Sequence, residues 1–293
     1  MSEDIILCEN LVKIYKTKDL EVLALQGLDL NIASGELMAI IGNSGSGKST
    51  LLNMLGGLDR PSAGKLIVDG KNLAKLNEQE LVHYKRETVG FVWQNNARNL
   101  VPYLNALQNV SLPMLFGEEK QKKQRALELL ELVGMAHKKN SRLNQLSGGE
   151  QQRIAIAIAL ANNPRILLAD EPTGSVDVKT GSYILDVFRE LNKSLGLTIV
   201  IVTHDRALSK KVNRVVAIRD GKTSSEMIVK QDYADKLDSI GMFEEAHDEY
   251  AVLDKAGRVQ IPKELQEQMG LTGNKVRLEL VDGKIVISAP ENE

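Results

Sequence analysis

The sequence is poor in cysteine and in net charge. The single cysteine, Cys8, excludes an internal disulfide and fits a reducing compartment. The formal net charge of -2 provides no overall attraction to nucleic acid or to anionic lipid. The composition therefore argues against a disulfide-stabilised secreted domain and against a generally basic nucleic-acid-binding protein.

Long apolar runs are also missing. No stretch approaches the roughly 20 apolar residues that a membrane-spanning helix needs. The N-terminal segment MSEDIILCEN lacks the basic and apolar regions of a secretory signal. We therefore expect a cytoplasmic protein without a membrane span of its own, held peripherally on the cytoplasmic face of the cell membrane by a partner.

What the chain does contain is an alternation of short β-branched runs and helical stretches. This pattern predicts an α/β domain over residues 1–222, with a helical subdomain at about 95–160. Residues 223–249 are rich in acidic side chains and are expected to form a solvated linker. A β pattern returns over residues 250–293, which predicts a second, small β-rich domain.

A phosphate-binding loop is predicted at residues 42–49. The sequence Gly-Asn-Ser-Gly-Ser-Gly-Lys-Ser fits G-x-x-x-x-G-K-[ST], with a predicted strand before it and a helix after it. The glycines let backbone N–H groups turn toward phosphates; Lys48 should reach the β- and γ-phosphates, and Ser49 should bind Mg²⁺. The nucleotide-binding residues expected here are Gly42, Asn43, Ser44, Gly45, Ser46, Gly47, Lys48, Ser49 and Thr50.

An acidic pair follows the apolar run Ile166–Ala169. Such a strand delivers its terminal carboxylates to the sheet edge where α/β folds bind ligands. Asp170 is the expected Mg²⁺ partner of Ser49, and Glu171 is the candidate general base that polarises the attacking water. Alone, the pair could be a solvated turn, but its combination with the phosphate loop favours the catalytic interpretation.

Residues 146–153, LSGGEQQR, predict a helix start with an anion-binding cap, because a serine hydroxyl and backbone N–H groups face outward there. This segment resembles the signature sequence of ABC ATPases, and the order of motifs over residues 3–222 agrees with that family. The resemblance implies a P-loop ABC-type fold and an ATPase that uses ATP and Mg²⁺. It also implies a homodimer, in which this cap contacts the γ-phosphate held by the other copy. The cap residues are Ser147, Gly148, Gly149 and Glu150.

Four further residues occupy positions where the same family has functional groups. Tyr15 resembles the aromatic residue that stacks on adenine, and Gln94 resembles the glutamine that contacts Mg²⁺ or the lytic water and senses the permease. His204 resembles the switch histidine that contacts the γ-phosphate, and Asp177 the aspartate that reaches across the dimer. A lone tyrosine or histidine would more often be structural, and the roles of all four residues rest on the resemblance.

The segments GLDRPSAG (57–64) and ADEPTG (169–174) resemble the macrolide-export and lipoprotein-release branch of the family. That branch implies a separate membrane permease as the partner, with export or extraction as the direction of transport. The substrate remains open because the permease selects it.

The C-terminal segment reads as a strand, a turn, a second strand, a short helix over Pro262–Met269 and a hairpin with a turn at Asp282-Gly283. Residues 253–265 resemble the AbrB-type swapped-hairpin domain, whose family dimerises and commonly binds DNA. Residues 250–293 carry six basic and seven acidic side chains, which is poor for phosphate-driven binding. Dimerisation is therefore favoured over nucleic-acid binding.

Two alternatives to a transporter ATPase stay open at this stage. One is an ATP-gated, DNA-associated regulator that uses the AbrB-like domain. The other is an ABC protein of ribosomes or DNA repair, although such proteins usually carry two ATPase heads or a long coiled coil, and neither pattern occurs in this sequence.

Overall fold

The structure, a computed structural model, describes residues 3–17, 20–94, 99–115, 118–174, 176–205, 211–229, 247–253, 257–261, 263–271 and 276–289. The chain divides into two units, Met1–Tyr250 and Ala251–Glu293. Within the described ranges, no helix combines the length and the apolar character that a membrane span requires.

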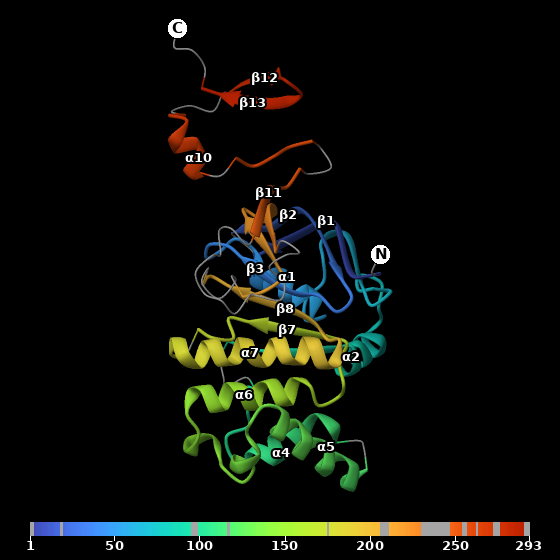
Figure 1. The fold of residues 1–293 in the computed structure, drawn as a ribbon. Helices are drawn as coiled ribbons and strands as arrows, with labels where there is room; N and C mark the ends of the chain where they lie inside the picture. Colours follow the sequence, from blue (N-terminus) through green and yellow to red (C-terminus); the bar gives the residue numbers. More distant parts are fainter. Residues whose placement is uncertain are drawn as a thin grey trace. The chain divides into compact units, whose positions relative to one another are not determined.

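The larger unit is built on a seven-stranded sheet with the order β11-β10-β9-β3-β8-β7-β6 (Figure 1). Its strands are β3 (Leu37–Ile41), β6 (Val89–Val92), β7 (Ile166–Asp170), β8 (Thr198–Thr203), β9 (Arg214–Arg219), β10 (Lys222–Val229) and β11 (His247–Ala251). Strands β9, β3, β8, β7 and β6 pair in parallel. Helices cover both faces of such strands, which is why β3 is apolar and buried along its whole length.

Alternate residues of the central strands enter two different cores. Met38 and Ile40 of β3 face a core shared with helix α1 (Lys48–Leu55) and the second sheet. Ala39 and Ile41 face a core shared with the helices of the other side. Because successive side chains of a strand point to opposite faces, the five residues of β3 connect both cores.

A four-stranded antiparallel sheet covers α1, in the order β2-β1-β4-β5. Its strands are β1 (Asp4–Lys16), β2 (Glu21–Ala33), β4 (Ala63–Val68) and β5 (Lys71–Asn72). Strand β1 pairs with β2 on one side and with β4 on the other. This register brings residues 12–15 next to residues 59–63, a juxtaposition that matters for the site.

Helix α2 (Glu78–Glu87) joins the core of α1 through Leu81 and Tyr84. The helices on the other face are α4 (Ala106–Ser111), α5 (Glu119–Leu132), α6 (Gly148–Ala159) and α7 (Val178–Leu195), with short 3₁₀ helices η1 (Leu112–Met114), η2 (Ala136–Lys138) and η3 (Leu143–Gln145). Helices α4, α5 and α6 contact one another, and they fall within the range 95–160 that the sequence predicts to be helical. Figure 1 draws α7 between α6 and α1.

The predicted start of the acidic linker at residue 223 is wrong. Residues 222–229 form β10, which pairs antiparallel with β9. Glu226 is not part of a solvated charge run, because it forms an ion pair of 2.8 Å with the half-buried Arg214. The larger unit therefore continues past residue 222. Most of the remaining linker prediction, residues 230–246, lies outside the described residues.

In the smaller unit, helix α10 (Lys263–Gln268) precedes the hairpin of β12 (Arg277–Val281) and β13 (Lys284–Ser288). The predicted turn is confirmed: Asp282 and Gly283 both have positive φ, 49° and 75°. Positive φ at both central residues is the type I′ geometry, whose twist matches that of the flanking strands.

Candidate active site

Three neighbouring parallel strands end at one edge of the central sheet, and each is followed by predicted functional residues. Ile41 of β3 pairs with Thr203 of β8, and Asp170 of β7 pairs with Val202 of β8. The phosphate loop follows β3, Glu171 follows β7, and His204 follows β8. Side chains from distant parts of the sequence thus meet where open α/β sheets bind ligands.

The backbone of the phosphate loop requires glycine at both ends. A Cβ on Gly42 would lie 2.3 Å from the carbonyl oxygen of Ile218, and Gly42 has φ 157°. A Cβ on Gly47 would lie 2.6 Å from the carbonyl oxygen of Ala24, and φ there is 102°. Gly47 is also the N-cap of α1, so the loop leads directly into a helix N-terminus, which attracts anions.

Lys48 lies beneath this loop. Its Nζ donates to the carbonyl oxygens of Gly42 at 2.7 Å and of Asn43 at 2.9 Å. Burial lowers the pKa of Lys48, and the carboxylates of Glu171 and Asp170 partly oppose that effect. A nearby phosphate would stabilise the positive charge of an ammonium group that burial has desolvated. The loop therefore fits a triphosphate. The buried Ser46 hydroxyl, which bonds to no described group, is a further polar atom in the cradle.

Two of the three predicted Mg²⁺ ligands, Ser49 of α1 and Asp170 of β7, lie together, and Gln94 follows β6. The hydroxyl of Ser49 lies 3.4 Å from Oδ1 of Asp170. The amide nitrogen of Gln94 lies 3.6 Å from the position that a Cβ on Gly174 would take, which places Gln94 beside the turn that follows Glu171. One hydroxyl, one carboxylate and one amide oxygen, completed by phosphate oxygens, suit the oxygen preference of Mg²⁺. Bound there, the ion would neutralise phosphate charge.

Glu171 and His204 form a hydrogen-bonded pair. Nδ1 of His204 donates to Oε1 of Glu171 at 2.7 Å. Glu171 has φ 45°, a strained conformation for a non-glycine residue, and its backbone N–H is held by the carbonyl oxygen of Val202 at 2.8 Å. The strain orients a largely buried carboxylate at the sheet edge, where it can accept a proton from water attacking a phosphate.

Tyr15 lies close to the helix that follows the phosphate loop. Its hydroxyl donates to Oδ2 of Asp59 at 2.7 Å and also interacts with Thr50 of α1. The side chain is 38% exposed. An exposed aromatic ring at the entrance of a phosphate site is suited to stacking on a planar base.

The predicted cap residues lie elsewhere in the chain. Ser147 is the N-cap of α6, where its hydroxyl accepts from the N–H of Glu150 and its own N–H donates to the Glu150 carboxylate. Asp177 is the exposed N-cap of α7 and accepts from Thr180. In Figure 1 the helix that carries the cap is separated from α1 by α7. Within the described part of one chain, no contact joins Ser147 or Asp177 to the phosphate loop.

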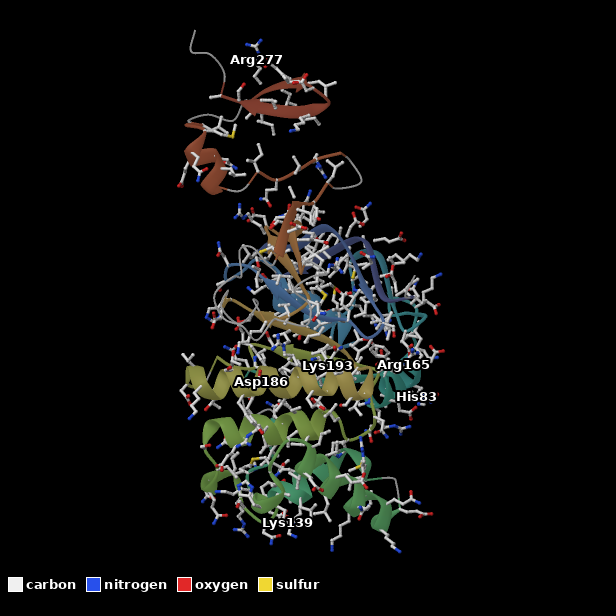
Figure 2. The ribbon with its side chains drawn as sticks, viewed as in Figure 1. His83, Lys139, Arg165, Asp186, Lys193 and Arg277 are labelled. Carbon is white, nitrogen blue, oxygen red and sulfur yellow. The ribbon has the colours of Figure 1, made fainter. Side chains whose placement is uncertain are left out.

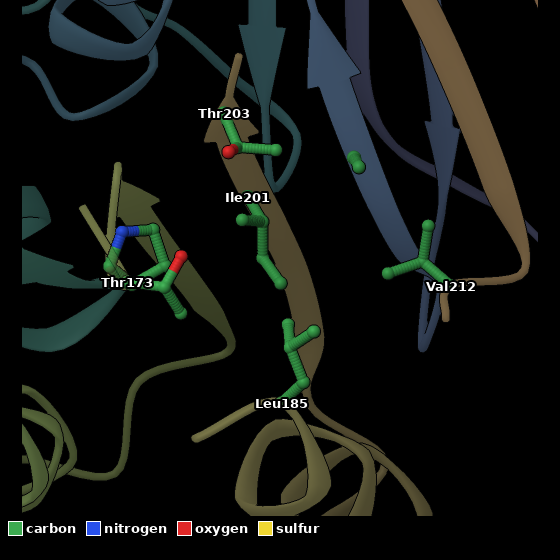
Figure 3. Close-up of a pocket in the computed structure, with 7 residues that line it drawn as sticks. Thr173, Leu185, Ile201, Thr203 and Val212 are labelled. Carbon is green, nitrogen blue, oxygen red and sulfur yellow. The ribbon is translucent and has the colours of Figure 1, made fainter. Parts of the chain in front are cut away.

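A small pocket is lined in part by Pro172 and Thr173, the two residues that follow Glu171 in the sequence (Figure 3). It is lined by Ala39, Pro172, Thr173, Leu185, Ile201, Thr203 and Val212. These side chains bear no charge, so the pocket cannot compete with the sheet edge for a phosphate. Its position does mean that the residues next to Glu171 and His204 pack against apolar groups.

The prediction from sequence missed the contacts that hold Tyr15. Asp59 and Lys13 surround its hydroxyl and one face of its ring. Local patterns could not reveal this arrangement, because Tyr15 and Asp59 lie 44 positions apart and meet through the pairing of β1 with β4.

Comparisons with known proteins agree with this geometry. The family model for ABC transporters matches residues 25–174. An uncharacterized ABC transporter ATP-binding protein of Thermotoga maritima is 48% identical over 212 residues, which are 72% of this chain and 89% of that protein.

Solved structures of ABC proteins share the fold. The ATP-binding cassette MJ0796, in a dimeric post-hydrolysis state bound to ADP and Pi, is 42% identical with a TM-score of 0.69, covering 75% of this chain and 97% of that one. CbiO1 from Clostridium perfringens, part of the ABC transporter complex cbiONQ, is 32% identical with a TM-score of 0.69, covering 75% of this chain and 87% of that one.

The fold, the sheet-edge chemistry and these relatives agree with the ABC-type α/β fold that the sequence predicts. The chain therefore belongs to the family of ABC transporter ATP-binding proteins, and it is an ATPase that uses ATP with Mg²⁺.

Proposed function

We propose that the chain is the ATPase subunit of a transporter in which two copies hydrolyse ATP between them and drive a separate membrane permease. One observation carries the proposal. The phosphate loop, Asp170, Glu171 and His204 meet at one sheet edge, whereas no described hydrogen bond joins them to the cap at Ser147, which begins α6 on β6 and α7. A second copy of the chain would supply that cap to the bound nucleotide.

In the proposed reaction each residue at the sheet edge has one task. The phosphate loop and Lys48 hold the triphosphate, and Ser49, Asp170 and Gln94 hold Mg²⁺. Glu171 takes a proton from the attacking water, and His204 orients the Glu171 carboxylate through the hydrogen bond at 2.7 Å. Tyr15 stacks on the adenine, while Gly149 and Asp177 of the second copy close the site. The dimeric state of the MJ0796 cassette supports this arrangement.

The test is Glu171→Gln in the full chain, which keeps the shape and removes the base. We expect ATP turnover to fall by a factor of about 10² to 10⁴. The ATP-bound protein should elute as a dimer in size-exclusion chromatography, because the closed state is no longer released. Asp186→Asn is the matched control, since Asp186 is an exposed carboxylate on α7 (Figure 2). Undiminished turnover in Glu171→Gln would contradict the assignment of the base.

The permease partner is supported by the family and by the assembly of CbiO1 in a transporter complex. Gln94 and the helical subdomain are the proposed contact, on the cytoplasmic face of the membrane. Tagged Glu171→Gln protein, purified from detergent-solubilised membranes with ATP and Mg²⁺, should retain a stoichiometric membrane protein. Recovery of DNA or of a complex without membrane proteins would contradict the proposal.

The branch of the family is a further part of the proposal. The segments at 57–64 and 169–174 favour the macrolide-export and lipoprotein-release type, with export or extraction as the direction. Measuring ATP-driven movement of cargo in vesicles that contain the co-purified permease tests both points. Accumulation of cargo on the cytoplasmic side would contradict this branch.

The smaller unit is proposed to be an AbrB-like dimerisation domain. In the register of β12 and β13, Leu278 faces Ile287 and Leu280 faces Ile285, so one face of the hairpin is entirely apolar. Leu280 is 76% exposed and Ile285 is 73% exposed in the single chain. A two-stranded hairpin is marginal in water, so a second copy that covers this face would stabilise it.

Sedimentation of the nucleotide-free chain tests this domain assignment. We expect a dimer for the wild type and a shift toward monomer for Leu280→Lys. Glu279→Lys is the matched control, because it places the same charge on the opposite face of the same strand. Equal masses for all three proteins would argue against dimerisation through this face.

A further inference from the structure

A short segment after α1 is fixed against β1 beside the proposed adenine site. The N–H of Ser62 donates to the carbonyl oxygen of Val12 at 2.8 Å, and the N–H of Ile14 donates to the Ser62 hydroxyl at 3.0 Å. These contacts on both sides of Lys13 hold the segment of Asp59 and Arg60 next to the strand.

Asp59 connects this segment to Tyr15. Its Oδ2 accepts from the Tyr15 hydroxyl at 2.7 Å, and its Oδ1 accepts from Nζ of Lys13 at 2.5 Å. Nζ of Lys13 also donates to the carbonyl oxygen of Arg60 at 2.9 Å. One carboxylate thus joins the ring hydroxyl to an ammonium group that is itself anchored to the backbone.

Lys13 in addition covers the ring. Its Nζ lies 4.8 Å from the centroid of the Tyr15 ring, within the range of a cation–π contact. The ring is therefore held at its hydroxyl edge and by the cation, yet the side chain keeps 38% of its surface exposed. A ring held in this way can offer its open surface to a planar ligand in one orientation.

The charge states agree with this arrangement. Partial burial opposes ionisation of Asp59, but the hydrogen bonds from Lys13 and Tyr15 outweigh it and lower the pKa of Asp59. Burial, followed by the hydrogen bond to Asp59, raises the pKa of Tyr15. At neutral pH an ionised carboxylate therefore accepts from a neutral phenol, and such charge-assisted bonds are stronger than neutral ones.

We propose that Asp59 and Lys13 are positioning residues that preorganise the Tyr15 ring for the adenine base of ATP. The inference rests on the proposed function, in which Tyr15 stacks on that base. Preorganisation lowers the cost of ordering a side chain when the ligand binds, so its loss should weaken binding of the base but not of the phosphates.

The test compares ATP with inorganic tripolyphosphate, which has the phosphates but no base. Calorimetric titration in the Glu171→Gln full chain avoids turnover. Tyr15→Phe removes only the hydroxyl, and Asp59→Ala removes the anchor. We expect each variant to lower the affinity for ATP by about three- to tenfold, which corresponds to the loss of one net hydrogen bond. The affinity for tripolyphosphate should change by less than about twofold. The double variant should be little weaker than either single variant, since both break the same contact.

Glu78→Ala is the matched control, because this exposed carboxylate pairs with Arg60 of the same segment at 3.1 Å but does not contact Tyr15. Unchanged ATP affinity in Tyr15→Phe and Asp59→Ala, or an equal loss for both ligands, would overturn the inference. Tyr15→Ala distinguishes failure of the positioning role from failure of the proposed base site. If it weakens ATP selectively while Tyr15→Phe does not, only the positioning role fails. If it leaves the preference for ATP over tripolyphosphate unchanged, the proposed base site is also wrong.

Discussion

The two units of the chain place their apolar side chains in opposite ways. In the ATPase unit, Ile40 of β3 and Leu52 of α1 are completely buried. In the C-terminal unit, Leu280 and Ile285 of the hairpin are 76% and 73% exposed. The first unit completes its own core from one chain, whereas the second leaves a regular apolar face of its hairpin exposed. Folding of the first is thus intramolecular, and we expect stability of the second to depend on association.

Individual glycines differ in how much room they leave for a side chain. A Cβ on Gly149 would lie 2.2 Å from Cγ2 of Thr180, so helices α6 and α7 are in contact there without spare room. At Gly257, Gly270 and Gly283 of the smaller unit, an added Cβ would meet no atom within 4 Å. Dense packing therefore constrains Gly149, while backbone conformation is the main constraint on the hairpin glycine, as it is on Gly45, Gly70 and Gly196 of the ATPase unit.

The largest difference should come from truncating a leucine in each unit. Leu52→Ala is expected to lower the free energy of unfolding of the ATPase unit by about 2–5 kcal/mol, because it removes buried contacts and leaves a cavity. Leu280→Ala should change the stability of that unit by less than about 0.5 kcal/mol. The only tryptophan, Trp93, stacks on Phe91 at 4.0 Å and reports on the ATPase unit alone, so urea unfolding followed by its fluorescence measures both variants. Equal midpoints would refute the contrast between the units.

Binding of ATP–Mg²⁺ should stabilise the ATPase unit against opening and leave the hairpin unaffected. This difference between the units is smaller than the one from truncating a leucine. Cys8 is the single cysteine, and burial raises the pKa of its thiol to about 12, so it should react with an alkylating reagent only when the ATPase unit opens. In the Glu171→Gln chain, ATP–Mg²⁺ at 100 times its Kd should slow labelling about 100-fold, corresponding to about 2.7 kcal/mol.

The control for that measurement moves the thiol to the hairpin. Glu279→Cys in a Cys8→Ala chain places it on the polar face of β12, where the side chain is exposed. Its labelling rate should not respond to ATP by more than about twofold, because the predicted nucleotide site lies in the ATPase unit. An equal response of both thiols would mean that the nucleotide stabilises the two units together.

Sequence was most informative where the chemistry is local. The phosphate loop, the acidic pair after β7 and the hairpin turn at Asp282-Gly283 each depend on neighbouring residues, and the structure has the predicted strands and turn around them. The ABC-type α/β fold of the larger unit was confirmed by the family and its solved structures, whereas the swapped-hairpin fold of the smaller unit remains a prediction. The roles of the individual site residues remain predictions.

Contacts between distant strands could not be predicted in the same way. The sequence alone places Glu226 in a run of acidic residues. In the structure it lies on β10 and pairs with Arg214 of β9. Arg214 also contacts Glu36 at 3.2 Å. A half-buried guanidinium requires such partners, and only the strand register shows which carboxylates reach it. The contact of Asp59 with Tyr15 was missed for the same reason.

The smallest predicted effect tests whether packing or chemistry makes Gly149 necessary. Gly149→Ala should lower the free energy of unfolding of the ATPase unit by about 1–3 kcal/mol, because the new methyl group collides with Thr180. Thr180→Ser removes the colliding Cγ2 and keeps the hydroxyl that bonds to Asp177, so the double variant should regain at least half of the loss. Gly283→Ala is the counterpart in the hairpin, where only its positive φ opposes the substitution and the Trp93 transition should not move. If Gly149→Ala instead abolishes ATP turnover at an unchanged unfolding midpoint, and Thr180→Ser restores nothing, then Gly149 acts through the nucleotide cap and not through the contact between α6 and α7.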